Sequence, residues 1–96
     1  MNKEKRKQLL KISWELRSQV EASYLNNPAK KGDSECLEKQ RILLADMALH
    51  LLQTSIHPDE IQLDKLCNNL HAILTITDQF LPEAELKKAA VKLYES

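Results

Sequence analysis

The sequence predicts an all-α protein, an antiparallel four-helix bundle that forms a single domain over residues 1–96. Composition favours helices, because the chain has one Gly, one Trp, one Phe and two Tyr, while Leu, Lys, Glu and Ala are abundant. Apolar residues recur at helical spacing in four segments, and no segment alternates with a period of two. Prolines mark three boundaries between these segments. Short connections between successive helices then predict antiparallel neighbours.

The first helix is expected to run from Lys3 to Leu25. One side of it carries apolar residues three or four positions apart, Leu9, Ile12, Leu16 and Val20. Trp14 and Tyr24 lie near the edge of this stripe, and we expect Trp14 to belong to the core. Asn26-Asn27-Pro28 ends the helix, because the residue before a proline is displaced from the helical region.

The second helix is expected to follow a loop that includes the sole glycine, Gly32. Asp33 or Ser34 is its predicted N-cap, and Glu35 suits the first turn. Its centre, RILLADMALHLLQ (residues 41–53), is apolar over a broad arc. A helix with such an arc contacts more than one neighbour, so we expect it to be the central element.

The third helix is expected to begin at His57-Pro58-Asp59-Glu60. Proline suits the first helical position, where its missing N–H costs nothing, and the two acids complement the helix N-terminus. A sustained apolar stripe follows, made of Leu63, Leu66, Cys67, Leu70, Ile73 and Leu74. The β-branched cluster at residues 75–77 weakens the helix, and a turn is predicted near residues 78–80.

The fourth helix is predicted over residues 82–95, because Leu81-Pro82-Glu83-Ala84-Glu85 repeats the same type of start signal. One narrow apolar side follows at helical spacing, formed by Leu86, Ala89, Ala90 and Leu93. An isolated helix of about fourteen residues is marginal in water. We therefore expect this segment to dock on the other helices.

Charge is zero overall but unevenly distributed. Residues 1–31 carry eight Lys/Arg and three Glu, whereas residues 32–96 carry six Lys/Arg and eleven Asp/Glu. The basic run at residues 2–8 suits nucleic acid or anionic lipid, but a solvated first helical turn is the simpler interpretation, and no nucleic acid is expected. The sequence shows neither a signal peptide nor a membrane-spanning run. Two cysteines, Cys36 and Cys67, are predicted to be buried or half-buried thiols of a cytoplasmic protein.

No motif in the sequence predicts catalysis or metal binding. Cys67 and His71 are four residues apart on one helix face, as two metal ligands would be. The other candidate ligands, Cys36, His50 and His57, form no CxxC or HxxxH pattern, and burial would make Cys67 a poor nucleophile. Neither a serine elbow, a phosphate loop, HExxH nor Glu-x-x-His is present. We expect a non-enzyme without metal or cofactor.

Binding by surface contacts is the remaining class of function. Four aromatic residues are the candidate anchors wherever they are exposed, Trp14, Tyr24, Phe80 and Tyr94, and we expect Tyr94 to be partly exposed. One hypothesis is a small helical adaptor, chaperone or regulator that binds a partner protein. DNA binding through Lys3, Lys5, Arg6 and Lys7 is another, although Gly32 lies in a longer loop than a helix-turn-helix uses.

Four features stand in a familiar order: Tyr24-Leu25-Asn26-Asn27-Pro28-Ala29-Lys30-Lys31, a Leu-rich stretch from Leu37 to Leu52, Leu63 to Leu74 with Lys65-Leu66-Cys67, and Leu81-Pro82 through Leu93-Tyr94. This order resembles the immunity proteins of pediocin-like (class IIa) bacteriocins. The last segment is longer than that family usually shows, and this chain is neutral where many relatives are basic.

The resemblance implies a non-catalytic cytosolic four-helix bundle. Such a protein protects a producing bacterium by acting from inside on the bacteriocin's membrane receptor, the mannose phosphotransferase permease. In that family the C-terminal half sets which bacteriocin is countered. The resemblance therefore implies partner-binding residues on the third and fourth helices, namely Phe80, Glu83, Lys87, Lys88 and Tyr94.

Overall fold

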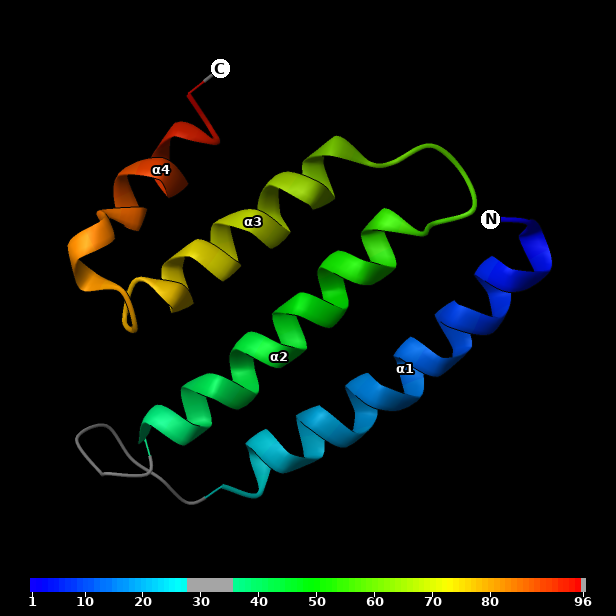
Figure 1. The fold of residues 1–96 in the computed structure, drawn as a ribbon, viewed down its shortest axis with the longest axis horizontal. Helices are drawn as coiled ribbons and strands as arrows, with labels where there is room; N and C mark the ends of the chain where they lie inside the picture. The colour runs from blue at the N-terminus through cyan, green and yellow to red at the C-terminus, as the bar shows by residue number, and fades with distance from the viewer. Residues whose placement is uncertain (28–35, 96) are drawn as a thin grey trace.

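The computed structural model describes residues 1–27 and 36–95. These residues form α1 (Lys3–Leu25), α2 (Cys36–Ser55), α3 (Leu63–Thr77), the short 3-10 helix η1 (Pro82–Ala84) and α4 (Leu86–Lys92). Of the described residues 78% are helical and none is in a strand, so the predicted all-α, four-helix fold class is confirmed (Figure 1). The predicted loop glycine and the N-caps of the second helix lie outside the described residues.

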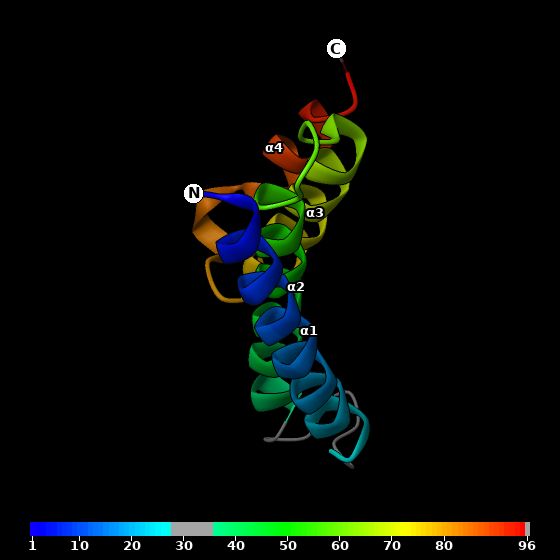
Figure 2. The same cartoon turned by 90° about the vertical axis from the view of Figure 1, so that its right-hand side faces the viewer.

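The helices lie side by side in one layer, each running antiparallel to the one before it (Figures 1 and 2). α1 contacts α2, α2 contacts α3, and α3 contacts α4. α2 therefore has two neighbours, as its broad apolar arc predicted, but α3 does too, so α2 is not the one central element. The Cα atoms extend over 45 × 37 × 15 Å, so the array is much thinner in one direction than in the other two.

This layer encloses little apolar core. Among the described residues only Ile56, Ile76 and Ala90 are buried apolar residues. The radius of gyration is 15.2 Å, whereas a compact domain of this length has about 12.5 Å. The four predicted helices are present, and they form an open array in place of a closed ring around a shared core.

Both ends of α1 follow local sequence signals. The Asn2 side chain accepts a hydrogen bond from the Lys5 N–H at 2.8 Å, which is an N-cap contact. The helix ends at Leu25, as predicted. Near its start, the Arg6 guanidinium donates to the carbonyl oxygens of Ile56 and His57 at 3.2 and 3.3 Å. A cation at these carbonyls stabilises the C-terminal end of α2 and fixes α1 against it.

The predicted start of the third helix is wrong. α3 begins at Leu63 with Gln62 as N-cap, and residues 57–62 are not helical. The Asp59 N–H donates to His57 Nδ1 at 3.3 Å, which closes a local bend. These residues reverse the chain between α2 and α3, and the apolar stripe of α3 starts only at Leu63. Because helices this short depend on packing, the proline signal alone did not start one.

The predicted continuous helix over residues 82–95 is also wrong. Pro82 begins a turn of 3-10 helix, but Glu85 then adopts φ 55° and ψ 39°, the left-handed region, before α4 starts at Leu86. This conformation costs a residue with a Cβ roughly 1–2 kcal/mol. The break redirects the chain so that α4 can lie along α3.

Docking of the C-terminal segment on the other helices is confirmed by its contacts with α3. Ala90 is only 3% exposed, and Leu86 and Leu93 beside it are half-buried. The Cys67 thiol donates to the Leu93 carbonyl oxygen at 3.3 Å. Small side chains at this contact let the two helices approach closely.

Candidate partner-binding surfaces

A polar seam joins α1 to α2. Ser13 is 1% exposed and donates to the Leu10 carbonyl oxygen at 2.6 Å, while accepting from Gln53 Nε2 at 3.0 Å. Gln53 Oε1 accepts from Arg17 Nη1 at 2.8 Å. The amide of Gln53 is thereby held in one orientation, with a donor on one side and an acceptor on the other. This seam connects residues 40 and 36 positions apart and fixes how α1 and α2 align.

The seam continues into an ion-pair cluster. Asp46 lies 3.9 Å from Arg17 Nε and 3.3 Å from His50 Nε2, and Arg17 lies 3.2 Å from Glu21. Ligand atoms of Glu21, Asp46 and His50 lie within 4.8 Å of one another, close enough to hold a metal ion. The Arg17 guanidinium already neutralises these carboxylates, and a cation entering there would be repelled by it. We therefore interpret the cluster as an ion-pair network between two helices.

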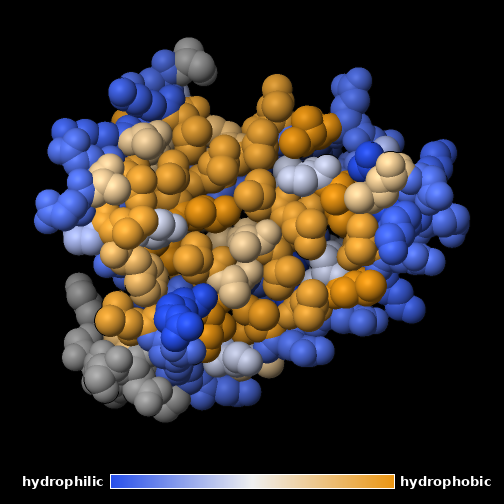
Figure 3. Space-filling view, in the orientation of Figure 1, coloured by the Kyte–Doolittle hydropathy of each residue, from blue (hydrophilic) through white to orange (hydrophobic). Residues whose placement is uncertain are grey.

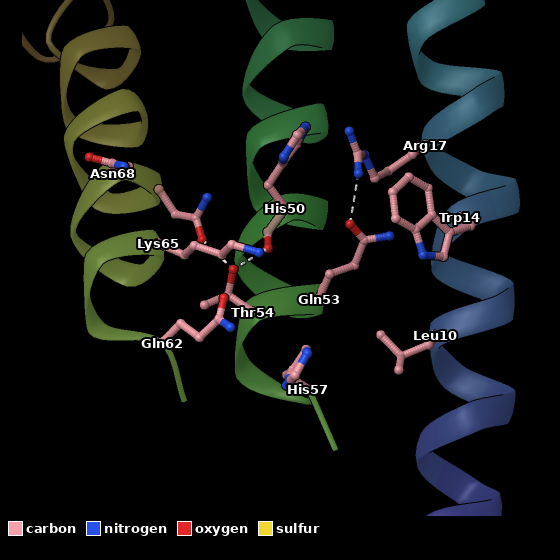
Figure 4. A pocket seen from close by; sticks show the side chains of 11 residues that line it. Leu10, Trp14, Arg17, His50, Gln53, Thr54, His57, Gln62, Lys65 and Asn68 are labelled. Atoms are coloured by element: carbon pink, nitrogen blue, oxygen red, sulfur yellow. Dashed lines mark hydrogen bonds between the residues drawn. The ribbon is translucent and has the colours of Figure 1, made fainter. Parts of the chain in front are cut away.

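A groove of about 420 Å³ crosses α1, α2 and α3 beside this seam (Figure 4). Hydrogen-bonding side chains dominate its lining, which consists of Leu10, Trp14, Arg17, His50, Gln53, Thr54, His57, Gln62, Lys65, Asn68 and Asn69. On the α2–α3 side, the Thr54 hydroxyl donates to Asn69 Oδ1 at 2.6 Å. This groove was not predicted, because its residues are scattered over three helices and the α2–α3 connection and form no motif.

The groove and the apolar stripes lie on opposite faces of the array. Followed from its N- to its C-terminus, α1 has α2 on its right in Figure 1 and on its left in Figure 4, so the two views are from opposite sides. Periodicity agrees, since Trp14 is two residues from both Ile12 and Leu16 and about 160–200° around the helix from each. We call the side shown in Figure 4 the groove face.

Trp14 does not belong to the core, and that prediction is wrong. Its side chain is 57% exposed at the edge of the groove, with the Arg17 guanidinium 4.5 Å from the ring centroid. A guanidinium at this distance makes a cation–π contact that orients the indole. Trp14 was predicted to lie near the edge of the apolar stripe and to belong to the core, but its position on the helix places it on the other face.

The five residues implied as partner-binding lie in two places. Phe80 and Glu83 are at the turn between α3 and α4, half-buried and exposed respectively. Lys88 is exposed and pairs with Glu85 at 3.2 Å. Lys87 lies in α4 and Tyr94 in the turn that follows it, and both reach back toward α3. Lys87 lies 3.9 Å from Asp78.

Tyr94 is 54% exposed, in line with the expectation of partial exposure. Its hydroxyl donates to Asn68 Oδ1 at 2.7 Å, and its ring lies 5.3 Å from that of His71. Two effects raise the pKa of Tyr94 above its ordinary value of 10.0. The larger is desolvation by partial burial, and the smaller is the neighbouring Cys67. Since Asn68 also lines the groove, Tyr94 extends the groove face to the turn after α4.

Cys36 and Cys67 are free, half-buried thiols, as predicted. Cys67 and His71 do share one side of α3, but both face α4, where the thiol bonds the Leu93 carbonyl and the imidazole contacts the Tyr94 ring. The single three-ligand group found within residues 1–27 and 36–95 contains neither of them. This pair therefore serves the α3–α4 contact.

The basic N-terminal residues divide into two kinds. Lys3, Lys5 and Lys7 are exposed. Arg6 is half-buried and occupied by the carbonyls at the end of α2. The four cations of the DNA-binding hypothesis are therefore not equivalent, because one of them holds the fold together.

The opposite side of the array is covered with apolar side chains (Figure 3). We call it the apolar face and define it by the residues that helical periodicity places there: Leu9, Ile12, Leu16, Val20, Leu37, Leu44, Ala48, Leu52, Leu63, Leu66, Leu70, Leu74, Leu86, Ala89 and Leu93. None of these is buried. Most of these stripes were predicted from the sequence, as the packing sides of helices in an antiparallel four-helix bundle.

None of the helices among the described residues combines the length and the hydropathy needed to cross a bilayer. Comparison of the chain with protein-family models, with curated proteins and with solved structures found no match.

Proposed function

We propose that this chain is a non-catalytic interaction protein that recognises a protein partner through its groove face. One observation carries this proposal: Trp14 and Tyr94, each more than half exposed, flank a groove lined by hydrogen-bonding side chains. Trp, Tyr and Arg are the residues that most often dominate binding energy at protein interfaces. Here all three types occur on one surface.

Both aromatic side chains are held in place before any partner arrives. Arg17 lies against the Trp14 ring at 4.5 Å, and Asn68 accepts the Tyr94 hydroxyl at 2.7 Å. A side chain that is already ordered loses less conformational entropy on binding. Exposed yet ordered aromatics favour recognition over a purely structural role.

We further propose that the process served is immunity to a class IIa bacteriocin, exerted inside the cell on the mannose phosphotransferase permease. Support for this role comes from the resemblance described above. In addition, the C-terminal segment is docked and leaves Glu83, Lys88 and Tyr94 exposed. These are positions at which that family's specificity would be expressed.

Survival of a sensitive strain expressing the protein tests the immunity role, with a panel of class IIa bacteriocins as the challenge. Wild type is expected to protect against at least one of them. Trp14→Ala and Tyr94→Ala are each expected to weaken partner binding by about 2 kcal/mol, which is roughly thirtyfold in Kd. Ile61→Ala is the matched control, because Ile61 is 44% exposed and does not line the groove.

The thermal midpoint of each variant separates loss of binding from loss of fold. If the wild-type protein protects against no bacteriocin of the panel, the immunity role is rejected. If it protects, and the two aromatic variants protect equally well at normal thermal midpoints, the groove face is not the recognition surface.

A second candidate is a small helical adaptor, chaperone or regulator. One observation favours it: the groove is formed by α1, α2 and α3, whereas the immunity family's specificity is held in the C-terminal half. Capture of one defined protein from lysate by wild type, but not by Trp14→Ala, in cells that gain no bacteriocin protection would support this candidate.

A further inference from the structure

We propose that the apolar face is covered by a second copy of this chain, giving a symmetric dimer of two helical layers. This inference is independent of the proposed function, because the groove lies on the other face. Protein domains are normally built from at least two packed layers, since a helix must bury its apolar stripe against another element. One copy supplies only one layer.

The surface area agrees with the need for a second layer. The chain exposes 7055 Å², whereas a compact monomer of 11.1 kDa exposes about 5,700 Å². The excess is about 1,400 Å², and a standard interface buries about 800 Å² on each partner. Burying this excess on both copies would match the area range of obligate homodimers, which is about 2,000 Å² or more in total.

The apolar face also has the composition of an interface core. Its exposed members include Ile12 at 50%, Leu52 at 41% and Leu63 at 70%, and such residues cover all four helices without interruption by the groove. Arg41 is the charged side chain that the periodicity of α2 places among them, and it is paired with Glu38 at 2.8 Å. Contiguous apolar surfaces of this extent mark association sites.

Charge selects a second copy and its orientation. Residues 1–27 carry six Lys/Arg and three Glu, a net +3, residues 36–56 are neutral, and residues 57–95 carry four Lys and seven Asp/Glu, a net −3. Charge therefore runs from positive at the α1 edge to negative at the α3–α4 edge. A two-fold axis lying in the layer and parallel to the helices places the α1 edge of one copy over the α3–α4 edge of the other. Opposite charges then face each other along both rims.

Sedimentation equilibrium on the full chain tests the association. The expected mass is twice the 11.1 kDa of one chain, and the thermal midpoint is expected to rise with protein concentration, because unfolding is then coupled to dissociation. A monomeric mass with a thermal midpoint that is independent of concentration would overturn the proposal. This readout needs no variant and is therefore unaffected by folding defects.

Variants locate the interface. The double variant Ile12→Glu with Leu52→Glu is expected to weaken association by at least about a hundredfold, because two carboxylates would be buried in place of apolar side chains. Leu25→Glu is the matched control: Leu25 is more exposed than either, and eleven residues from Trp14 it lies on the groove side of α1. Dissociation by Leu25→Glu, or a dimer unaffected by the double variant, would contradict this interface.

A zero-length carbodiimide cross-link tests the orientation. In the dimer band, bonds are expected between lysines of α1 and carboxylates of residues 78–95, which α2 and α3 separate from α1 within one chain. In dimers mixed from isotope-labelled and unlabelled chains, bonds from α1 lysines of one chain to α1 carboxylates of the other would reject the orientation, and the label separates them from the Lys7–Glu4 pair within one chain. A chain that is monomeric in solution but binds vesicles of phosphatidylcholine and phosphatidylglycerol through Ile12 and Leu52 would show that a membrane, not a second copy, covers the face.

Discussion

Two helix contacts in this molecule use different chemistry to bring backbones together. Between α1 and α2 the most buried side chains are polar, Ser13 at 1% and Asp46 at 8% exposure. Between α3 and α4 the buried residue is Ala90, at 3%. α1 and α2 are 23 and 20 residues long, whereas α4 has only seven residues.

The difference shows how helix length limits the type of contact. Two long helices offer many positions, so the α1–α2 contact includes a hydrogen-bonded network that specifies one alignment through Ser13, Gln53 and Arg17. A helix of two turns has room for one close approach. The α3–α4 contact therefore relies on a small residue, with hydrogen bonds from Cys67 and Tyr94 at its margins. The following changes test this contrast.

The largest effect is expected from Arg17→Leu. It leaves Asp46 buried with its principal cation removed, since both side chains are less than 15% exposed. Breaking a buried pair in this way costs about 3 kcal/mol of unfolding free energy, measured by chemical denaturation. The double variant Arg17→Leu with Asp46→Leu is expected to recover most of the loss. Equal destabilisation by both variants would mean that packing, and not the unpaired charge, is responsible.

Ala90→Leu is expected to cost about 1–3 kcal/mol, because the added atoms overfill the closest point between α3 and α4. The damage should stay local, with faster hydrogen exchange in α4 and little change in α1. Ala84→Leu is the control, since Ala84 is exposed and does not belong to the apolar face. If Ala90→Leu accelerated exchange throughout α1 and α2, the two contacts would not be separable.

Ser13→Ala is expected to cost about 1 kcal/mol, because Gln53 Nε2 loses its acceptor in a buried position. Ser18→Ala, at an exposed site of the same helix, should change the unfolding free energy very little. If Ser13→Ala has the same unfolding free energy as wild type, the hydrogen bonds of the polar seam do not add to the stability of the α1–α2 contact.

Glu85→Gly is expected to stabilise the protein by about 1 kcal/mol, because glycine adopts the left-handed conformation without the steric cost that a Cβ imposes. The lost pair with Lys88 is exposed and contributes little. Glu83→Gly, at a position with ordinary backbone angles, should destabilise instead. Stabilisation by Glu83→Gly alone would contradict the assignment of strain to residue 85.

The smallest effect concerns Tyr94 at alkaline pH. Because its pKa is raised in the folded state, Tyr94 contributes stability that is complete below pH 10 and is lost as the pH rises through the folded value. Ultraviolet titration should detect one tyrosine that ionises above pH 10, and Tyr94→Phe should remove it. If the ionisation above pH 10 disappears in Tyr24→Phe and not in Tyr94→Phe, the assignment to Tyr94 is wrong.

Sequence signals specified much of the fold. The spacing of apolar residues located four helical segments, Asn26-Asn27-Pro28 located the end of α1, and the stripe around Ala90 predicted that the C-terminal segment docks. They failed where a boundary depends on packing. Pro58 and Pro82 are both suitable helix starts, yet residues 57–62 reverse the chain and Glu85 interrupts the last segment. Of the candidate site, Tyr94 was anticipated, whereas the groove was not.

By itself, the sequence determined which segments are helical and which side of each helix is apolar, because both depend on residues a few positions apart. Only the tertiary structure decided that the helices lie in one layer, that Trp14 is exposed beside Arg17, and that Ser13 meets Gln53. These outcomes depend on contacts between residues far apart in the chain. Periodicity identifies an apolar side but carries no information about which neighbour covers it.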